Sequence, residues 1–162
     1  MKLLPKSTKN LYKLVIDTST FFSAIYNPKG NEAQLFELAD KGICKIYVHD
    51  YVLEELKEVF IRKNIDFKLI LKLLDTYDNI IIQKLIDLTD EEIKLAKEMI
   101  NDPEDRPIFI FAKRMIDRYK NTYFISGDKG FFKKKVTDSL INKVLKTKNI
   151  IKKMKYLRKI FQ

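Results

Sequence analysis

The sequence predicts an α/β fold built on a mostly parallel sheet. Short apolar runs alternate along the chain with longer segments of helical periodicity, a pattern typical of strand–helix–strand units. At 162 residues and 46% hydrophobic content, the chain is long enough for one domain with a substantial core. Only 4 Gly and 4 Pro argue against a loop-rich architecture. We therefore expect a single α/β domain.

Apolar runs predict the strands. The first run stops at Asp17, the second follows Gly42, and the last of the long runs ends before the turn sequence "SGD". A shorter run, "KKVT", has the length of an edge strand. The predicted strands are 13–17, 44–49, 79–85, 122–126 and 134–137.

Helices are predicted where the apolar spacing becomes three to four residues. A helix begins near Ser19, and the turn "PKGN" at 28–31 separates it from a helix at 32–42, which ends at Gly42. Asp50 is the expected N-cap of the next helix, which is amphipathic. Thr89 and Glu92 have the spacing of a capping box. The later helices are expected at 50–63, 66–77, 89–100, 108–119, 138–146 with Asp138 as its cap, and 148–162.

Composition narrows the function classes. No apolar stretch approaches the roughly 18 residues of a membrane span, and "MKLLPKSTKN" lacks a signal-peptide apolar region, so we expect a cytoplasmic protein without a membrane partner. A single cysteine, Cys44, excludes an internal disulfide and a cysteine cluster, and a single histidine, His49, excludes a multi-histidine zinc site. Any metal site must use oxygen ligands, which favours Mg²⁺ or Mn²⁺.

The positive charge is concentrated at the C-terminal end. Residues 133–162 supply the whole net charge of +10, because they contain 11 Lys or Arg and one acid, Asp138. Residues 1–132 thus form a body with no net charge. We divide the chain into a domain at 1–146 and a basic amphipathic helix at 147–162, with Ile151, Met154, Leu157 and Phe161 on one face. This helix has four open interpretations: contact with nucleic acid, a solvated helix without a partner, attachment to an anionic membrane, or packing on a second subunit.

Two aspartates follow predicted strands. Asp17 ends the first strand, and Asp128 comes just after the strand at 122–126. The carboxyl ends of parallel strands share one edge of the sheet, where ligands bind in open α/β folds. Each aspartate alone is also compatible with an ordinary helix N-cap or turn residue.

A third aspartate and one glutamate are candidates to join them. Asp105 precedes Arg106 and Pro107, which makes it a candidate N-cap of the next helix. Its neighbours Asp102 and Glu104 could substitute for it or assist it, although we expect them to be solvated. In the helix at 50–63, Glu54 and Glu58 lie about 160° from the centre of the apolar arc and should face water. Glu55 lies about 100° away, at the border, from which it can reach a cleft.

Four carboxylates in one cleft would repel one another strongly. One or two divalent cations would offset this repulsion, and such ions activate water for phosphodiester hydrolysis. The residues present offer no serine–histidine or cysteine–histidine mechanism as a rival. A metal-dependent hydrolase is therefore the prediction that the acids support.

Four segments, in this order along the chain, resemble the motifs of the PIN-domain nuclease family: "VIDTSTFFSAI", "YVLEELKEV", "DRPIFIFA" and "FISGDKGF". The resemblance covers residues 13–137. It implies a three-layer α/β/α sandwich, dependence on Mg²⁺ or Mn²⁺, and cleavage of RNA. Many small prokaryotic members are VapC-type toxins paired with an antitoxin protein, and others process RNA. A homodimer is expected on the same ground.

The resemblance assigns roles by motif. Asp17, Glu55, Asp105 and Asp128 match the four acids that ligate the metal and carry catalysis. Ser19 and Ser126 stand where small polar residues orient water or phosphate, although Asn is frequent at the position of Ser19. Lys129 is assigned to the RNA backbone as a hypothesis. Residues 147–162 have no counterpart in the minimal pattern, which argues against the short toxin type.

Two rival functions remain open. A PIN-like module that has lost catalysis could bind RNA or a protein, although all four acids are present. An aspartyl-phosphate enzyme would need an acid where Ser19 stands in "DTST", and a receiver-type domain finds only a poor lysine candidate in Lys129.

Overall fold

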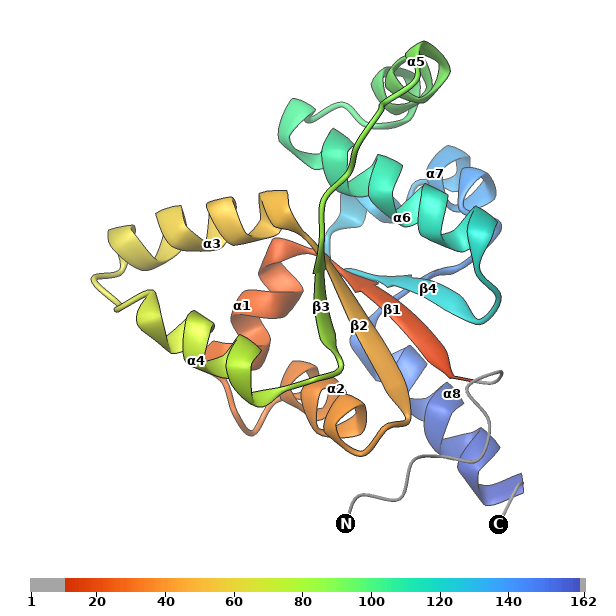
Figure 1. Ribbon diagram of the computed structural model, residues 1–162. Helices are drawn as coiled ribbons and strands as arrows, with labels where there is room; N and C mark the ends of the chain where they lie inside the picture. Colours follow the sequence, from red (N-terminus) through yellow and green to blue (C-terminus); the bar gives the residue numbers. More distant parts are fainter. Residues whose placement is uncertain (1–10, 161–162) are drawn as a thin grey trace.

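The protein folds around a single five-stranded sheet, seen in a computed structural model that describes residues 11–160, without the side chains of 157, 158 and 160 (Figure 1). The strand order is β3-β2-β1-β4-β5, and every neighbouring pair is parallel. The strands are β1 (Tyr12–Ile16), β2 (Cys44–His49), β3 (Ile80–Gln83), β4 (Thr122–Ile125) and β5 (Val144–Leu145). The predicted α/β fold with a mostly parallel sheet is confirmed.

The helices connect the strands and cover both faces of the sheet. Those of the first half are α1 (Thr18–Tyr26), α2 (Asn31–Asp40), α3 (Asp50–Arg62) and α4 (Lys68–Thr76). Those of the second half are α5 (Asp90–Met99), α6 (Arg106–Arg118), α7 (Lys134–Ser139) and α8 (Thr147–Ile160), with 3-10 turns η2 (Pro103–Asp105) and η3 (Lys129–Phe132). In Figure 1, α1 and α2 lie on one side of the sheet and α6 on the other, giving the expected three layers.

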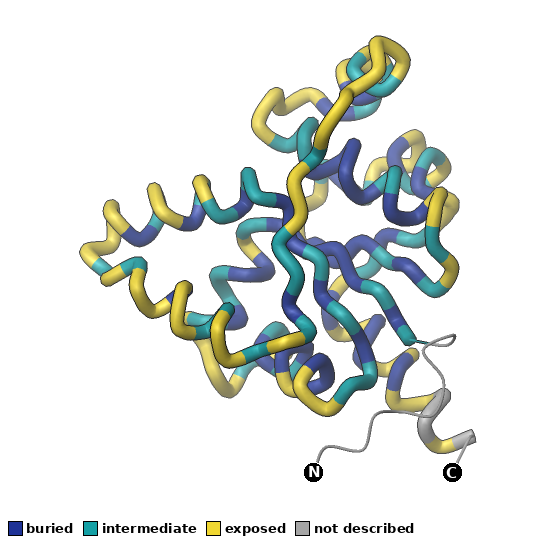
Figure 2. Tube along the Cα trace, viewed as in Figure 1, coloured by how far each residue is buried: buried dark blue, intermediate teal, exposed yellow. Residues whose placement is uncertain are grey.

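The sheet holds together because its central strands are apolar on both faces. Leu14, Val15 and Ile16 of β1 are fully buried, as are Ile46 and Val48 of β2. Continuous apolar runs of this kind are typical of parallel strands covered by helices on both sides. Figure 2 shows the burial concentrated along these strands, whereas α5 and the outer parts of α3 and α4 are exposed.

The order of the strands creates a switch point between β1 and β4. The chain proceeds from β1 through β2 to β3 in one direction, then crosses to β4 and β5 on the other side of β1. At such a point the loops that follow the two strands diverge to opposite faces and leave a crevice. The residues after β1 and β4 therefore occupy the place where this fold accommodates a ligand.

Two predicted elements near the C-terminal end are wrong. Residues 134–137 form the first part of α7 rather than an edge strand, because Val136 and Leu140 are buried one helical turn apart. The helix predicted at 138–146 does not form, since Ile141 and Asn142 adopt positive φ angles of 54° and 56° and end α7. The edge strand is β5 instead, paired with Phe124 and Ile125 of β4.

Helix α8 is part of the same packed fold. It packs against α2 through a buried face that includes Ile150, Ile151 and Met154. Leu157 and Phe161, also predicted on this face, lie outside the described side chains. Because its apolar side contacts the domain, the lysines of α8 point outward. Among residues 11–160 no helix combines the length and the hydropathy that crossing a membrane requires.

Arg114 of α6 ties together the segment between β3 and α5. Its guanidinium donates to the carbonyl oxygens of Ile86 and Asp87 at 2.7 and 2.8 Å and forms a two-point ion pair with Glu92 of α5. The hydrogen bonds from Arg114 to the Glu92 carboxylate hold the pKa of Glu92 well below its usual 4.5, at about 2. The predicted capping box of Thr89 and Glu92 is present at the start of α5.

We expect E92Q to lower the stability of the fold at pH 7 by about 1–2 kcal/mol, because the partly exposed ion pair is lost. The pKa of Glu92 is lower in the folded state than in the unfolded chain. Its stabilisation is therefore complete above about pH 4.5 and disappears as the pH falls toward 2. Urea denaturation across this pH range tests the expectation, with the exposed neighbour variant E91Q as control. A difference between E92Q and the wild type that persists unchanged at pH 2 would contradict it.

Candidate active site

A polar pocket of about 140 Å³ opens beside the carboxyl ends of the central strands. Five carboxylates surround it, together with hydroxyl groups and one apolar side chain. The lining residues are Asp17, Thr18, Ser19, Tyr51, Glu55, Glu104, Asp105, Ile108 and Asp128. The structure therefore brings the four predicted acids into one pocket, together with Glu104, which is exposed to solvent as expected and also lines the pocket.

Asp17 is the most buried of these acids, with 7% of its surface exposed. It follows β1 directly and forms the N-cap of α1, where its Oδ1 accepts a hydrogen bond of 2.9 Å from the backbone N–H of Thr20. Ser126, beyond β4, donates its hydroxyl to Oδ2 of Asp17. The carboxylate thus links the two strands at the switch point, and its position is fixed by both.

Ser126 also positions Asp128. Its hydroxyl oxygen accepts a hydrogen bond of 3.0 Å from the backbone N–H of Asp128, while Asp128 accepts one of 2.8 Å from Gly130. One buried serine therefore contacts the segments that carry two acids. A Cβ atom at residue 130 would lie 3.3 Å from Oδ1 of Asp128, so a larger residue would crowd this turn.

Glu55 enters the pocket from α3, whereas Glu54 and Glu58 are exposed, in the arrangement that the helical wheel predicts. The hydroxyl of Thr18 donates to Oε2 of Glu55, and Tyr51, one turn earlier on α3, also hydrogen-bonds to this carboxylate. Burial raises the pKa of Glu55 in spite of these bonds, and the negative charges of Glu104 and Asp17 raise it further. The ionised form of Glu55 is thus disfavoured by its surroundings.

Asp105 occupies the N-cap position of α6, but its side chain accepts no capping hydrogen bond. The reason is that η2 runs directly into α6, so that Asp105 has helical backbone angles (φ −84°, ψ −13°) and cannot fold back as a cap. The prediction that it caps this helix through its side chain is wrong. Burial, followed by the charges of Asp128 and Asp102, raises its pKa to about 6.

Arg106 fixes the turn that carries Glu104 and Asp105. Its Nε donates to the carbonyl oxygen of Ile100 at 3.0 Å, and its Nη2 donates to that of Asn101 at 3.2 Å. The guanidinium is therefore committed to the backbone at the end of α5. Asp102 accepts from the N–H of Glu104 and starts η2.

The remaining predicted residues lie at different depths. Ser19 lines the pocket and donates to Asp17 at 3.3 Å. Ser126 is buried behind Asp17, where it contacts acids rather than the open pocket. Lys129 is exposed at the start of η3, next to Asp128, and is not among the residues that line the pocket.

Three residues around the site were not predicted from the sequence. Thr18 and Tyr51 line the pocket, and His49, rather than the predicted Asp50, caps α3. The spacing of Tyr51 and Glu55 by one helical turn could have indicated that they share a face. Glu104, named from the sequence as a possible assistant of Asp105, lines the pocket from the 3-10 turn η2.

His49 holds the start of the helix that carries Tyr51 and Glu55. Its Nδ1 accepts a hydrogen bond of 3.1 Å from the N–H of Tyr51, and its ring packs against Phe111. Burial lowers the pKa of His49, although the neighbouring Asp50 carboxylate opposes this effect. Its Nε2 is buried and has no hydrogen-bond partner among residues 11–160. His49 is thus a neutral cap.

Comparison with known proteins gives the family. A model of the PIN domain matches residues 13–130, which is most of the chain. This chain belongs to the PIN-domain family. Among solved structures it is similar to the VapBC2 complex from Rickettsia felis bound to a DNA fragment from its promoter, with 17% identity, a TM-score of 0.49, and 74% of this chain and 91% of that chain covered. No curated protein matches the sequence.

PIN domains are in general nucleases that use divalent metal ions. The pocket of this PIN domain fits such an ion in its chemistry, because its charged ligands are all carboxylates, and the mutual repulsion that raises the pKa of Asp105 would be relieved by a cation. Among the described residues, no three Asp, Glu, His or Cys side chains converge closely enough to hold an ion. To hold one, the acids would have to rotate toward a shared centre.

In metal-free buffer we expect D105N to stabilise this PIN domain by about 1–2 kcal/mol, because it removes a partly buried charge that its neighbours repel. Thermal denaturation at pH 8 with a chelator measures this change. The exposed Asp75 provides the matched control, D75N, which should leave the melting temperature unchanged. If D105N melted below the wild type under these conditions, the acids would not be repelling one another as described.

Proposed function

We propose that this PIN domain is an endoribonuclease that depends on Mg²⁺ or Mn²⁺ and hydrolyses RNA phosphodiester bonds. The observation that supports the proposal most directly is the pocket, in which four separate segments present Asp17, Glu55, Asp105 and Asp128. These segments are far apart in the sequence, and general requirements of the fold do not call for four acids to meet.

We assign the roles by the family motif to side chains that line the pocket or contact those that do. Asp17, Asp105 and Asp128 would hold the ion, with Glu55 as a ligand directly or through water. A bound divalent ion supplies an activated water and stabilises negative charge on the phosphoryl oxygens. Ser126 and the Thr20 N–H keep Asp17 in place, and Thr18 and Tyr51 orient Glu55. The expected products carry 5′-phosphate and 3′-hydroxyl ends.

On the family resemblance alone, the proposal includes a cytoplasmic homodimer and two alternative roles, either as a toxin that an antitoxin protein neutralises or as an RNA-processing enzyme. Induced expression in a bacterial host separates the roles. Arrest of growth by the wild type but not by D17N supports the toxin, whereas normal growth with altered RNA ends supports processing.

We expect D17N to lose metal-dependent RNA cleavage by more than about 100-fold, since even outer partners of a metal site account for 10- to 100-fold. The substitution keeps an oxygen that can accept from Thr20, so the fold should remain intact by circular dichroism. The measurement is a Mn²⁺ titration of cleavage of a fluorescent single-stranded RNA, with D75N as the matched control.

The titration also separates the enzyme from its rival. If D17N cleaved RNA as well as the wild type, the assignment of the pocket would be wrong. If the wild type bound RNA but cleaved none at any metal concentration, a non-catalytic RNA-binding module would replace the enzyme as the proposed function.

A further inference from the structure

The acidic pocket cannot by itself attract a polyanion. Five carboxylates line it, and the amino-acid sequence gives residues 1–132 no net positive charge, since 21 basic residues face 21 acids there. A strand of RNA carries one negative charge per nucleotide, so attraction must come from cations that lie near the pocket but outside it. The C-terminal segment carries the whole net charge of the protein, which makes it the place to search.

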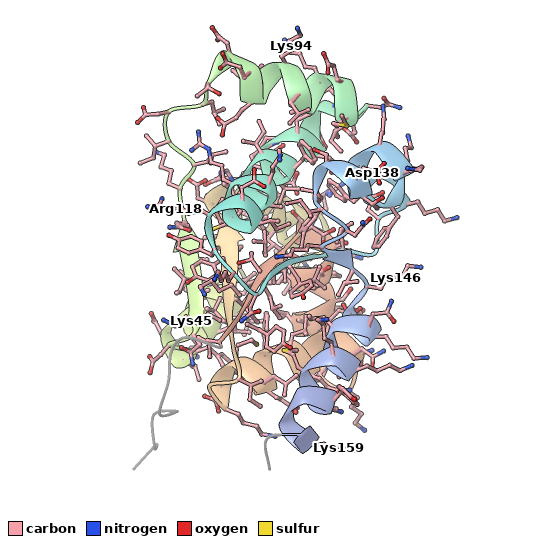
Figure 3. The ribbon with its side chains drawn as sticks, turned by 90° about the vertical axis from the view of Figure 1, so that its right-hand side faces the viewer. Lys45, Lys94, Arg118, Asp138, Lys146 and Lys159 are labelled. Atoms are coloured by element: carbon pink, nitrogen blue, oxygen red, sulfur yellow. The ribbon has the colours of Figure 1, made fainter. Side chains whose placement is uncertain are left out.

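Five lysines of this segment form what we call the lysine ridge: Lys143, Lys146, Lys148, Lys152 and Lys153. All are exposed except Lys143, which is half-buried. Among residues 11–160 no carboxylate forms an ion pair with any of them, whereas the neighbouring Lys134 is paired with Asp138. Figure 3 shows Lys146 and Lys159 near the two ends of α8, at the surface of the molecule.

The lysine ridge is linked to the acids of the pocket through Lys146. Ser126, which bonds to Asp17 and positions Asp128, donates its N–H to the carbonyl oxygen of Leu145 at 3.2 Å, and Lys146 follows directly. The ammonium group of Lys146 lies 5.8 Å from the ring centroid of Phe132, at the end of η3, the turn that Asp128 caps. Lys146 is thus joined to the acids through a short chain of contacts.

Aromatic rings hold the ridge lysines along the edge of the sheet. The ammonium groups of Lys143 and Lys153 lie 5.9 and 5.5 Å from the same ring centroid, that of Tyr123 on β4. Each contact is favourable because the ring attracts a cation, and the two lysines are thereby kept close to the same strand. Together with Lys148 and Lys152 on the outward side of α8, they continue the positive surface away from the pocket.

We propose that the lysine ridge binds the phosphate backbone of the single-stranded RNA whose scissile bond lies in the pocket. The ridge lies outside residues 13–130, the part of the chain that the PIN-domain model matches. This inference rests on the proposed function for the position of the scissile bond. RNA is favoured over an acidic protein as partner because Lys146 follows Leu145, whose carbonyl oxygen accepts the N–H of Ser126, the residue that bonds to Asp17.

The test removes three ridge charges, in the triple variant K143Q/K146Q/K153Q. Its matched control is K57Q/K68Q/K72Q, which removes three exposed lysines from α3 and α4. Affinity for a fluorescent oligouridylate is measured in chelator across a range of salt concentrations, so that no cleavage occurs. We expect the ridge variant to bind at least about tenfold more weakly at low salt, and its slope of log K against log salt to fall by about 2, at ~0.7 for each lost phosphate contact.

Each outcome decides the inference. Equal affinity and equal slope for the two variants, with unchanged melting temperatures, would overturn it. Polyglutamate serves as a probe for an acidic protein partner. If it bound the wild type as tightly as the RNA does, and bound the ridge variant more weakly by the same factor, the ridge would be a binding site for an acidic protein instead.

The failure of the proposed enzyme would be visible separately. If the wild type bound RNA through the ridge but did not cleave it with Mn²⁺, RNA binding by the ridge would be supported and the nuclease activity would be excluded. Conversely, the ridge variant could cleave a long RNA and a dinucleotide as efficiently as the wild type and bind RNA with unchanged affinity. This result would support the nuclease activity and exclude RNA binding by the ridge.

Discussion

The buried carboxylate of Asp17 is the constraint on which both the sheet and the pocket depend. A negative charge at 7% exposure is costly unless polar groups surround it. The N-terminus of α1 supplies one, through the N–H of Thr20, and β4 supplies the other, through the hydroxyl of Ser126. Because these groups come from both sides of the switch point, the charge is tolerated only when β1, α1 and β4 are correctly assembled.

The carboxylates of the pocket disfavour folding, because folding brings their negative charges close together. Asp105 and Glu55 have raised pKa values because burial and neighbouring carboxylates disfavour their charged forms. The surrounding structure keeps them in place through groups that do not neutralise them, such as the Thr18 hydroxyl and the backbone bonds of Arg106. A large apolar core outweighs the repulsion, so the domain tolerates an unfavourable cluster of like charges at this edge of the sheet.

Much of this architecture could be predicted from the sequence, and the exceptions have physical causes. Continuous apolar runs located the central strands, and the end of the first run located Asp17, because both depend on the local sequence pattern. The angle of Glu55 followed from helix geometry alone. By contrast, the side chain of Asp105 and the position of Glu104 depend on a 3-10 turn that runs into α6. Residues 134–146 were misassigned because only pairing with β4 makes β5 a strand.

The short outer strand β5 also bears on how the molecule behaves in concentrated solution. An open sheet edge offers unpaired backbone groups to any extended chain that approaches it, which is a route to aggregation. Here the edge is two residues long, Lys143 and Lys146 stand at its two ends, and α8 follows at once. Charge and brevity together leave little backbone on which a second sheet could grow, so this side of the protein resists edge-to-edge polymerisation.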